Sequence, residues 1–314
     1  MKALKYSDIT LMPKCSVLRT RSDADTSITL GDRKFKLPVV PANMQAVIDL
    51  STARALSDND YFYIMHRFDV DPLNFCSSDA RTLKTISISV GVTDKDKQNI
   101  ITLAKSGLRV DYITIDIAHG HSILMKSMIE HIKTHLPSAF LIAGNIATKD
   151  AVLDLEDWGA DCIKVGIGQG SACITKDKTG FTYPMFSCML ECSAVAKVPL
   201  IADGGIAANG DFAKAIRAGG TMVMAGSIFS KCTDSPAPSI VKDGQIYKQY
   251  YGSASEKNKG HNNHIEGVIR EVPSNNMSYE EKYLEIKQDL QSSISYAGGT
   301  DLSCLNSVEY KTLI

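Results

Sequence analysis

Eight short apolar runs alternate along the chain with stretches of helical pattern, and this alternation constrains the fold more than any other feature. The runs carry β-branched and apolar residues on both faces, as parallel strands covered by helices do. Eight such steps predict an α/β chain folded as a (β/α)8 TIM barrel, and an open doubly wound sheet is the alternative. The predicted strands are residues 39–44, 61–66, 85–92, 112–117, 139–146, 162–167, 198–202 and 221–225.

The length of 314 residues suits one barrel, since such barrels run to about 250 residues plus insertions. We therefore expect residues 1–314 to form a single (β/α)8-barrel domain. After the eighth strand the polar residues 235–273 leave the alternation, and residues 279–290 predict a closing C-terminal helix. The other predicted helices are residues 50–56, 97–106, 122–136, 149–158, a stretch after Pro184, and 211–218.

The charge balance gives the chain no general attraction for polyanions. It has 34 basic and 35 acidic side chains, a formal charge of −1, so we expect no nucleic-acid and no membrane partner. No run approaches the roughly 18 apolar residues of a membrane span, and residues 1–5 lack the apolar core of a signal peptide. The 8 cysteines include no CxxC pair. Scattered cysteines of this kind are typical of reduced thiols, which predicts a cytoplasmic protein.

Polar residues and glycines gather where the predicted strands end. A single glycine there is typical of a turn, but many together indicate a site at the carboxyl-terminal face, where barrels carry their catalytic groups. The residues concerned are Asn43, His66, Asp116, 144–145, 166–168, 203–205 and 226–227.

Residues 252–273 are predicted to form a mobile flap over the barrel mouth. The segment is charged and amide-rich, and it contains the string KNKGHNNH at residues 257–264. Long insertions at the active-site end of a barrel often act as lids. A solvated loop without function is the alternative.

The segment 164–176 contains the most informative chemistry. The predicted strand ends in closely spaced glycines, and Cys173 and Thr175 follow two residues apart. Glycines supply positive φ and let the backbone approach a ligand closely. A thiol on such a loop, with Lys176 near it, can ionise and act as a nucleophile. We expect a catalytic loop at about 166–180, and a small loop residue without chemistry is the alternative for Cys173.

Two segments predict a phosphate site. Residues 201–205 and 225–227 follow the seventh and eighth strands, where barrels hold a phosphate. Backbone N–H groups and the Ser227 hydroxyl would bind its oxygens, and the Asp203 carboxylate suits a ribose diol. The chain has no GxGxxG fingerprint between a strand and a helix, so a nicotinamide cofactor would not be held as in a Rossmann fold.

The loop GIGQGSACIT, residues 166–175, resembles the GxGPGSxCxT loop of the family of IMP dehydrogenases and GMP reductases. The resemblance covers nearly the whole chain and is closest to the shorter bacterial-type GMP reductases. The strings that carry it are RSDADT, VVPANM, YFYIMHRF, YITIDIAHGHS and DLQSSISYAGGT.

The resemblance implies NADPH-dependent reductive deamination of GMP to IMP, a reaction of purine interconversion and salvage. The Cys173 thiolate would attack C2 of guanine, and the 2-amino group would leave as ammonia. Hydride from NADPH would then reduce the covalent thioimidate, and IMP would depart. Thr175 and Glu266 match the family's proton-relay pair, and protonation of the leaving amine is general-acid work.

The resemblance also implies the binding residues. The positions that match nucleotide-binding residues are Ser171, Asp203, Gly204, Gly205, Gly226, Ser227, Gly252, Ser253 and Ala254. Those that match cofactor-binding residues are Thr20, Arg21, Arg67, Asp116, Ile117, Ala118, Ile167, Ser292, Ser293 and Ser295. A basic Arg67 suits a 2′-phosphate and favours NADPH over NADH.

A monovalent cation and an oligomer are implied in the same way. The carbonyls of Gly168, Gly170 and Cys173 match a cation site that typically holds K⁺. Family members are commonly tetramers, so a homotetramer is expected.

The chain departs from the family pattern at three places. Gln169 replaces the usual proline, which would loosen the catalytic loop. Asn263 and Ile265 stand where some reductases have Arg and Ser near the base, so the contacts to the base would differ. The flap is also short.

Three other functions remain as alternatives. An IMP dehydrogenase shares the first covalent step but normally carries an Arg-Tyr pair in a long flap, and residues 253–273 contain no Tyr and only Arg270. Most dehydrogenases also insert a regulatory domain pair where this chain has only residues 67–84. A non-catalytic nucleotide-binding barrel would not need Cys173, Thr175 and Glu266, and a flavin-dependent barrel would not need the thiol loop.

Overall fold

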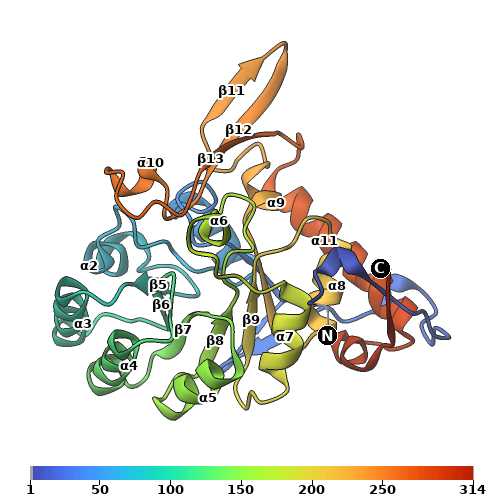
Figure 1. Cartoon of the computed structure of the whole chain (residues 1–314), viewed down its shortest axis with the longest axis horizontal. Helices are drawn as coiled ribbons and strands as arrows, with labels where there is room; N and C mark the ends of the chain where they lie inside the picture. The colour runs from blue at the N-terminus through green and yellow to red at the C-terminus, as the bar shows by residue number, and fades with distance from the viewer. Residues whose placement is uncertain (1–2, 314) are drawn as a thin grey trace.

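The computed structural model describes residues 3–313 and confirms the α/β barrel (Figure 1). Its parallel strands form one curved 7-stranded sheet in the order β4-β10-β9-β8-β7-β6-β5. The first strand pairs with the last, and the others follow in chain order without the reversal that a doubly wound sheet requires. The strands are β4 (Val39–Pro41), β5 (Ser87–Val90), β6 (Tyr112–Asp116), β7 (Phe140–Ile146), β8 (Cys162–Val165), β9 (Leu200–Asp203) and β10 (Met222–Ala225).

The strand predicted at residues 61–66 is wrong as a strand, although the segment lies where the second of the eight predicted strands belongs, in chain order between β4 and β5. Phe62 to Met65 are buried, and the Met65 N–H donates to the Ser87 carbonyl of β5 at 3.1 Å. The Tyr61 N–H instead bonds back to Leu56 at 2.9 Å, which bends the chain away from a regular ladder. Side chains hold the segment in place, because the hydroxyls of Tyr63 and Ser89 bond to backbone carbonyls across this contact.

The helices form the outer layer, and most begin at a polar cap. Thr93 and Asp96 make a capping box, so the helix predicted from residue 97 begins at Asp94. Ser122 and Thr148 accept backbone N–H groups in the same way. The main helices are α1 (Leu50–Asp58), α3 (Asp94–Ser106), α4 (Ile123–His135), α5 (Lys149–Asp157), α7 (Met185–Ser193), α8 (Gly210–Arg217) and α11 (Tyr279–Ala297). Shorter turns are α2 (Pro72–Asn74), α6 (Thr175–Thr179), α9 (Ser227–Ser230), α10 (Glu256–Lys259), η1 (Tyr6–Asp8), η2 (Arg21–Asp23), η3 (Phe75–Asp79) and η4 (Leu302–Ser307).

The C-terminal helix α11 is longer than its predicted range. Ile294 and Ala297 are buried, and the helix ends only at Gly298, which takes a φ of 79°. Packing of these apolar residues carries the helix through the serine-rich stretch 292–295, which has a weaker intrinsic preference for helix. The chain then returns, and β14 (Tyr310–Thr312) pairs antiparallel with β1 (Ile9–Leu11).

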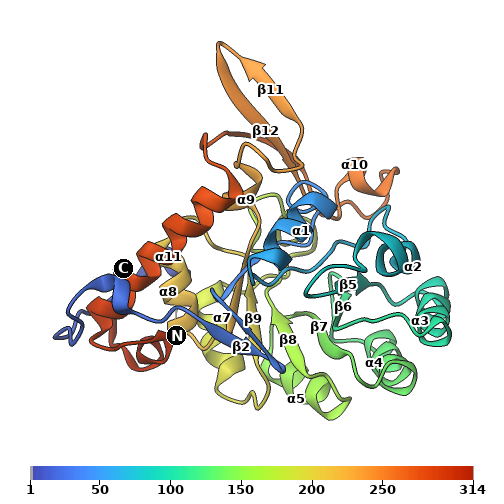
Figure 2. The same ribbon diagram turned by 180° about the vertical axis from the view of Figure 1, so that it is seen from behind.

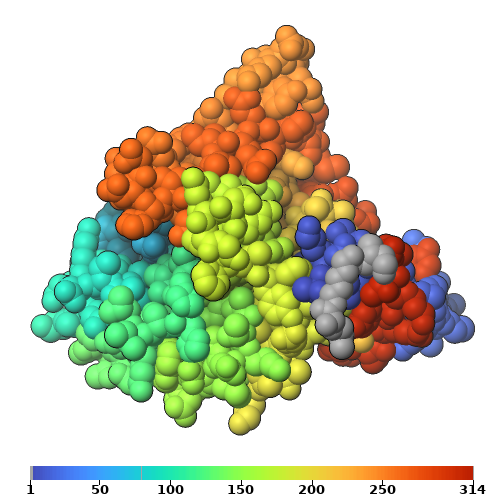
Figure 3. Space-filling model, viewed as in Figure 1, coloured from blue at the N-terminus to red at the C-terminus, as the bar shows by residue number. Residues whose placement is uncertain are grey.

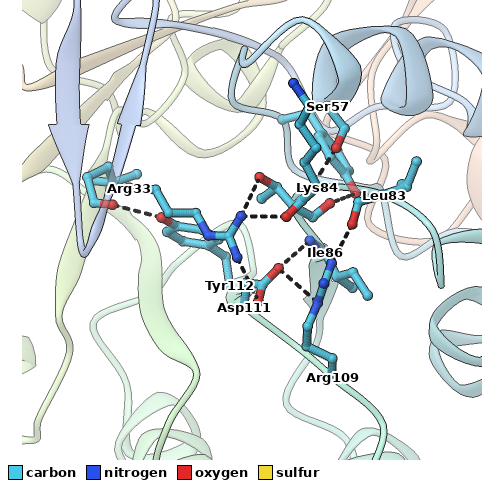
Figure 4. Close-up of polar contacts among 11 residues, drawn as sticks. Arg33, Ser57, Leu83, Lys84, Ile86, Arg109, Asp111 and Tyr112 are labelled. Atoms are coloured by element: carbon cyan, nitrogen blue, oxygen red, sulfur yellow. Dashed lines mark hydrogen bonds and ion pairs between the residues drawn. The ribbon is translucent and has the colours of Figure 1, made fainter.

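A hairpin of β2 (Ile28–Leu30) and β3 (Arg33–Phe35) is fixed at the amino-terminal ends of β5 and β6 (Figures 2 and 4). Asp111 pairs with Arg33 at 3.3 Å and with Arg109 at 3.4 Å, and its second oxygen accepts the Ile86 N–H at 2.7 Å. The Tyr112 hydroxyl donates to the Leu30 carbonyl at 2.7 Å. This end of a barrel serves stability, and chemistry lies at the other end.

The polar excursion after the eighth strand contains a three-stranded antiparallel sheet that the sequence analysis did not predict. It consists of β11 (Ser239–Lys242), β12 (Gln245–Tyr251) and β13 (Ile269–Pro273), and it projects from the barrel rim (Figure 1). Asp243 and Gly244 form the turn, with φ of 50° and 76°. An Asp-Gly pair is a strong hairpin signal and could have indicated this element.

Among the described residues, 3–313, no helix combines the length and apolarity that a bilayer crossing requires.

Candidate active site

A cavity of about 550 Å³ opens at the carboxyl-terminal rim of the barrel. Strand ends line its floor, and the catalytic loop and the flap line its walls. The predicted site residues that line it are Cys173, Thr175, Glu266, Asp203, Gly252, Ser253, Ala254, Arg67, Asp116, Ile117, Ala118, Ile167, Gly168 and Gly170. Most of the predicted site therefore lies around one space.

The catalytic loop leaves β8 through glycines that the local backbone requires. Gly166 has a φ of 146°, and a Cβ there would lie 2.0 Å from the Asp203 carbonyl oxygen. Gly168 has a φ of 75°. The Cys173 N–H then closes a turn onto the Gly170 carbonyl at 3.0 Å, and α6 begins two residues later. The glycines thus let the loop fold back so that the thiol lines the cavity.

The flap is paired with the catalytic loop on both sides of the thiol. The Val268 N–H donates to the Ala172 carbonyl at 2.9 Å, and the Ile174 N–H donates to the Glu266 carbonyl at 2.9 Å. Figure 3 shows the two segments in contact over this face of the barrel. These bonds fix where the flap side chains lie relative to Cys173.

A thiol, a hydroxyl and a carboxylate form a hydrogen-bonded chain at this junction. Cys173 Sγ lies 3.1 Å from Thr175 Oγ1, and Thr175 Oγ1 donates to Glu266 Oε2 at 2.7 Å. A hydroxyl between a thiol and a carboxylate can pass a proton along the chain. The structure thus brings together three residues that the sequence singled out, one of them 91 positions from Thr175.

The floor carries a buried lysine that the sequence analysis missed. Lys164 is 2% exposed, and its Nζ lies 2.9 Å from Asp116 Oδ1 and 2.8 Å from Asp203 Oδ2. Burial raises the pKa of Asp116, but the Lys164 ammonium, helped by Arg67 and Asn43, more than offsets burial, so that the pKa lies below its usual value. The only signal in the sequence was a lysine inside an otherwise apolar strand, CIKV.

Asn145 supports the same floor. Its Nδ2 donates to Asp203 Oδ2 at 2.8 Å and to the Gly166 carbonyl at 2.7 Å. The side-chain oxygen of Asn145 is buried and has no partner within the structure.

The predicted phosphate residues Ser171, Gly204, Gly205, Gly226 and Ser227 do not line the cavity itself. The N–H groups of Gly204 and Gly205 already donate to the carbonyls of Met224 and Gln169 at 3.3 and 3.2 Å. They are therefore not free donors in this conformation.

Tyr250 lies at the junction of the cavity and the phosphate residues, and the sequence analysis did not select it. The residue lines the cavity and is 3% exposed. A Cβ on Gly226 would fall 2.4 Å from the Tyr250 hydroxyl oxygen, so this glycine leaves room for the hydroxyl. Burial raises the pKa of Tyr250 well above its usual value, which keeps the hydroxyl a hydrogen-bond donor.

Five predicted cofactor residues form a separate cluster and are not brought to the cavity. Arg21 stacks on the Tyr296 ring with 5.3 Å to its centroid and lies 3.4 Å from the Ser292 hydroxyl. Ser295 bonds to Ser16 at 2.9 Å. The cluster lies along α11, on the side of the barrel away from α10 (Figure 1). Its predicted members are Thr20, Arg21, Ser292, Ser293 and Ser295.

Of the residues that differ from the family pattern, Asn263 lines the cavity together with His261 and His264. The Asn263 N–H donates to His261 Nδ1 at 3.2 Å. Ile265 is not part of the lining. Within residues 3–313 no cluster of His, Cys, Asp and Glu could hold a metal ion, and a cation bound by carbonyls alone would not need one.

Comparison with known proteins identifies the family. Residues 3–312 match the family model described as IMP dehydrogenase / GMP reductase domain. A GMP reductase of Leptothrix cholodnii is 50% identical over 316 residues, covering 100% of this chain and 97% of that protein. GMP reductases of Bacillus cereus and Bacillus subtilis are 51% and 50% identical, each covering 97% of this chain and 94% of the relative.

Gln169 does not leave the catalytic loop loose. Its Nε2 donates to Thr182 Oγ1 at 2.5 Å, and Thr182 Oγ1 donates to the Ile167 carbonyl at 3.0 Å. The side chain thus ties the loop to the segment after α6, where a proline would stiffen it through its ring.

We expect Gln169→Pro to be tolerated and Gln169→Ala to loosen the loop. Within residues 3–313 no backbone hydrogen bond is donated by the Gln169 N–H, so a proline there loses none. The alanine variant loses a bond worth about 0.5–1.5 kcal/mol, which lowers Tm by roughly 1–5 °C. Calorimetry measures Tm, and mass spectrometry after brief iodoacetamide treatment measures faster alkylation of Cys173 in the alanine variant.

Thr182→Val removes the same bond from the other side and, in addition, the bond from Thr182 Oγ1 to the Ile167 carbonyl. It should therefore lower Tm at least as much as Gln169→Ala does, and combining the two changes should lower Tm no further than Thr182→Val alone. Equal damage from the proline and alanine variants would contradict the expectation that a proline ring can replace this bond.

Proposed function

The chain belongs to the IMP dehydrogenase and GMP reductase family, and from that premise we propose that it is an NADPH-dependent GMP reductase. The reaction would convert GMP to IMP with release of ammonia, in purine interconversion and salvage. The observation that carries the proposal is the chain from Cys173 through Thr175 to Glu266, with separations of 3.1 and 2.7 Å. It unites a nucleophile with a proton relay at one end of the cavity.

The proposed order of bond making and bond breaking follows from this hydrogen-bonded chain of three side chains. The Cys173 thiolate attacks C2 of the guanine ring, and the C2–N bond breaks as the amine takes a proton passed from Glu266 through Thr175. Ammonia leaves, and a thioimidate joins C2 to sulfur. Transfer of hydride to C2 and loss of the thiolate then yield IMP, and a proton taken up from water restores the acid at Glu266.

The nucleotide would lie over Asp203, whose carboxylate can accept hydrogen bonds from the ribose hydroxyls. Ser171, Gly226 and Ser227 are proposed to hold its phosphate together with Gly204 and Gly205, which requires the two glycine N–H groups to exchange their present partners. Flap residues Gly252, Ser253 and Ala254 line the same space.

The reducing half of NADPH supplies the hydride and is proposed to lie against Asp116, Ile117, Ala118 and Ile167, all of which line the cavity. Arg67 also lines it and could meet an anionic group of the cofactor. The cluster along α11 does not reach this cavity within one chain. In the homotetramer that we propose, a neighbouring copy would present that cluster to the other end of the cofactor.

A monovalent cation, K⁺ in the simplest case, is proposed to bind the carbonyls of Gly168, Gly170 and Cys173. The left-handed backbone at Gly168 supports this, since it turns successive carbonyls within a short loop. A cytoplasmic location remains part of the same proposal.

The flap argues for reduction over the hydrolysis that an IMP dehydrogenase performs. Arg270 is the flap's only arginine, and it lies in β13 opposite Tyr250, exposed and outside the cavity lining. No arginine of the flap is therefore placed to activate water at the thioimidate.

The direct test follows NADPH absorbance with purified protein and GMP while ammonia and IMP are measured in the same sample. The expected result is loss of NADPH matched one to one by ammonia and IMP. Reduction of NAD⁺ with IMP, and no reaction with GMP and NADPH, would identify a dehydrogenase. Binding of GMP without either reaction would identify a non-catalytic barrel.

Cys173→Ala should abolish turnover and leave GMP binding nearly unchanged, because the thiol makes the covalent bond and Asp203 and the phosphate residues hold the nucleotide. Stopped assays measure turnover, and isothermal titration measures binding. Cys304→Ala, in η4, is the control and should retain full activity. Appreciable residual turnover in Cys173→Ala would exclude covalent catalysis by this residue.

Glu266→Gln should slow the reaction of GMP by about 10²–10⁴-fold, because the leaving amine loses its acid. A 2-chloro analogue of IMP should be affected far less, since chloride leaves without a proton. Comparing the two rates isolates proton delivery, and Glu256→Gln, exposed in the same flap, controls for general damage. An equal loss with both substrates would overturn the relay assignment.

A further inference from the structure

Strand β8 directs a lysine into the interior of the barrel, where the proposed mechanism does not use it. Lys164 is charged but only 2% exposed, and its neighbours along the strand, Ile163 and Val165, are apolar and fully buried. An unpaired buried ammonium is strongly unfavourable, so Lys164 can be buried only because it has partners of opposite charge.

The sheet register explains how one lysine reaches two carboxylates. Asp116 of β6 pairs with Gly144 of β7, and Gly144 pairs with Lys164 of β8, so the three lie in one row. A Cβ on Gly144 would lie 2.6 Å from the Lys164 Cβ, and the glycine therefore gives the lysine room to extend across β7. On its other side lies β9, which ends in Asp203.

The ammonium takes one oxygen from each carboxylate. Its Nζ contacts Asp116 Oδ1 at 2.9 Å and Asp203 Oδ2 at 2.8 Å. Asn145 Nδ2 adds a second bond to the same Oδ2 of Asp203. Both residues line the cavity, and their side chains are 16% and 20% exposed, for Asp116 and Asp203 respectively.

We propose that Lys164 is a positioning residue that orients Asp116 toward the cofactor and Asp203 toward the nucleotide. This inference rests on the proposed function, which assigns the two carboxylates to different ligands. Without the lysine, two buried carboxylates would share one floor, with the Arg67 guanidinium near Asp116 as the remaining positive charge. Either carboxylate would then turn away or take a proton, and each would lose its geometry for the ligand hydroxyls.

The test measures binding of GMP and of NADP⁺ separately by isothermal titration, which needs no turnover. Lys164→Met should weaken both ligands, on the order of tenfold to a hundredfold each, as expected when a charge-assisted contact is lost. Asp203→Asn should weaken GMP alone. The double variant Lys164→Met/Asp203→Asn should bind GMP no more weakly than Asp203→Asn, because the lysine acts through that carboxylate.

Lys248→Met is the matched control for removing a buried lysine. Lys248 is 3% exposed, and its Nζ donates to the carbonyls of Thr233, Ser235 and Ala237 at 2.9, 3.2 and 3.3 Å, away from the cavity. It should lower Tm and leave both affinities unchanged. If Lys164→Met does not fold, Asp116→Asn/Lys164→Met removes a carboxylate charge with the ammonium. That variant should lose GMP affinity, whereas Asp116→Asn alone should keep it.

Two results would overturn the positioning role. One is unchanged affinity for both ligands in the folded Lys164 variants. The other is multiplied losses of GMP affinity in the Lys164→Met/Asp203→Asn variant, as independent effects would give. These results are distinguishable from a failure of the proposed function, in which the unmodified protein itself would not convert GMP and NADPH to IMP and ammonia.

Discussion

The ion pairs of Lys164 with Asp116 and Asp203 join three strands at the carboxyl-terminal end of the barrel, below the cavity. They depend on the pairing of Asp116 with Gly144 and of Gly144 with Lys164, directly before the β7–β8 register shifts, and on the room that Gly144 leaves for the lysine. A buried ammonium between two carboxylates is tolerated only with such geometry. The polar side chains of Lys164, Asp116 and Asp203 therefore lie together, and they form the floor of the cavity.

The two ends of the barrel are organised by different interactions. At the amino-terminal end, Asp111 binds arginines from the β3 hairpin and from the loop before β6, and Figure 4 shows these contacts converging on one carboxylate. At the other end Asp116 and Asp203 line the cavity and are paired with the buried Lys164. Stability and chemistry are thus separated along the strand direction, as in other barrels.

The sequence predicted the fold class, the positions of most strands and the residues of the thiol loop, because local periodicity and glycine spacing encode them directly. It did not predict that Lys164 and Tyr250 line the cavity, since that depends on neighbours from other strands. The segment 61–66 has the composition of a strand, yet the Tyr61 N–H bonds back to Leu56 in α1 and the segment does not form a regular strand ladder. The Asp-Gly turn of the β11–β12 hairpin was readable, whereas the location of Arg21 far from Arg67 depends on how α11 packs.

Glu266 belongs to the flap, and the thiol belongs to the barrel loop. Two backbone hydrogen bonds, Val268 to Ala172 and Ile174 to Glu266, join these parts on either side of Cys173. Any displacement that breaks these bonds withdraws the carboxylate from Thr175 in the same movement. The position of the flap and the carboxylate beside the thiol are thus coupled, so a displaced flap and an intact Cys173–Thr175–Glu266 chain exclude each other.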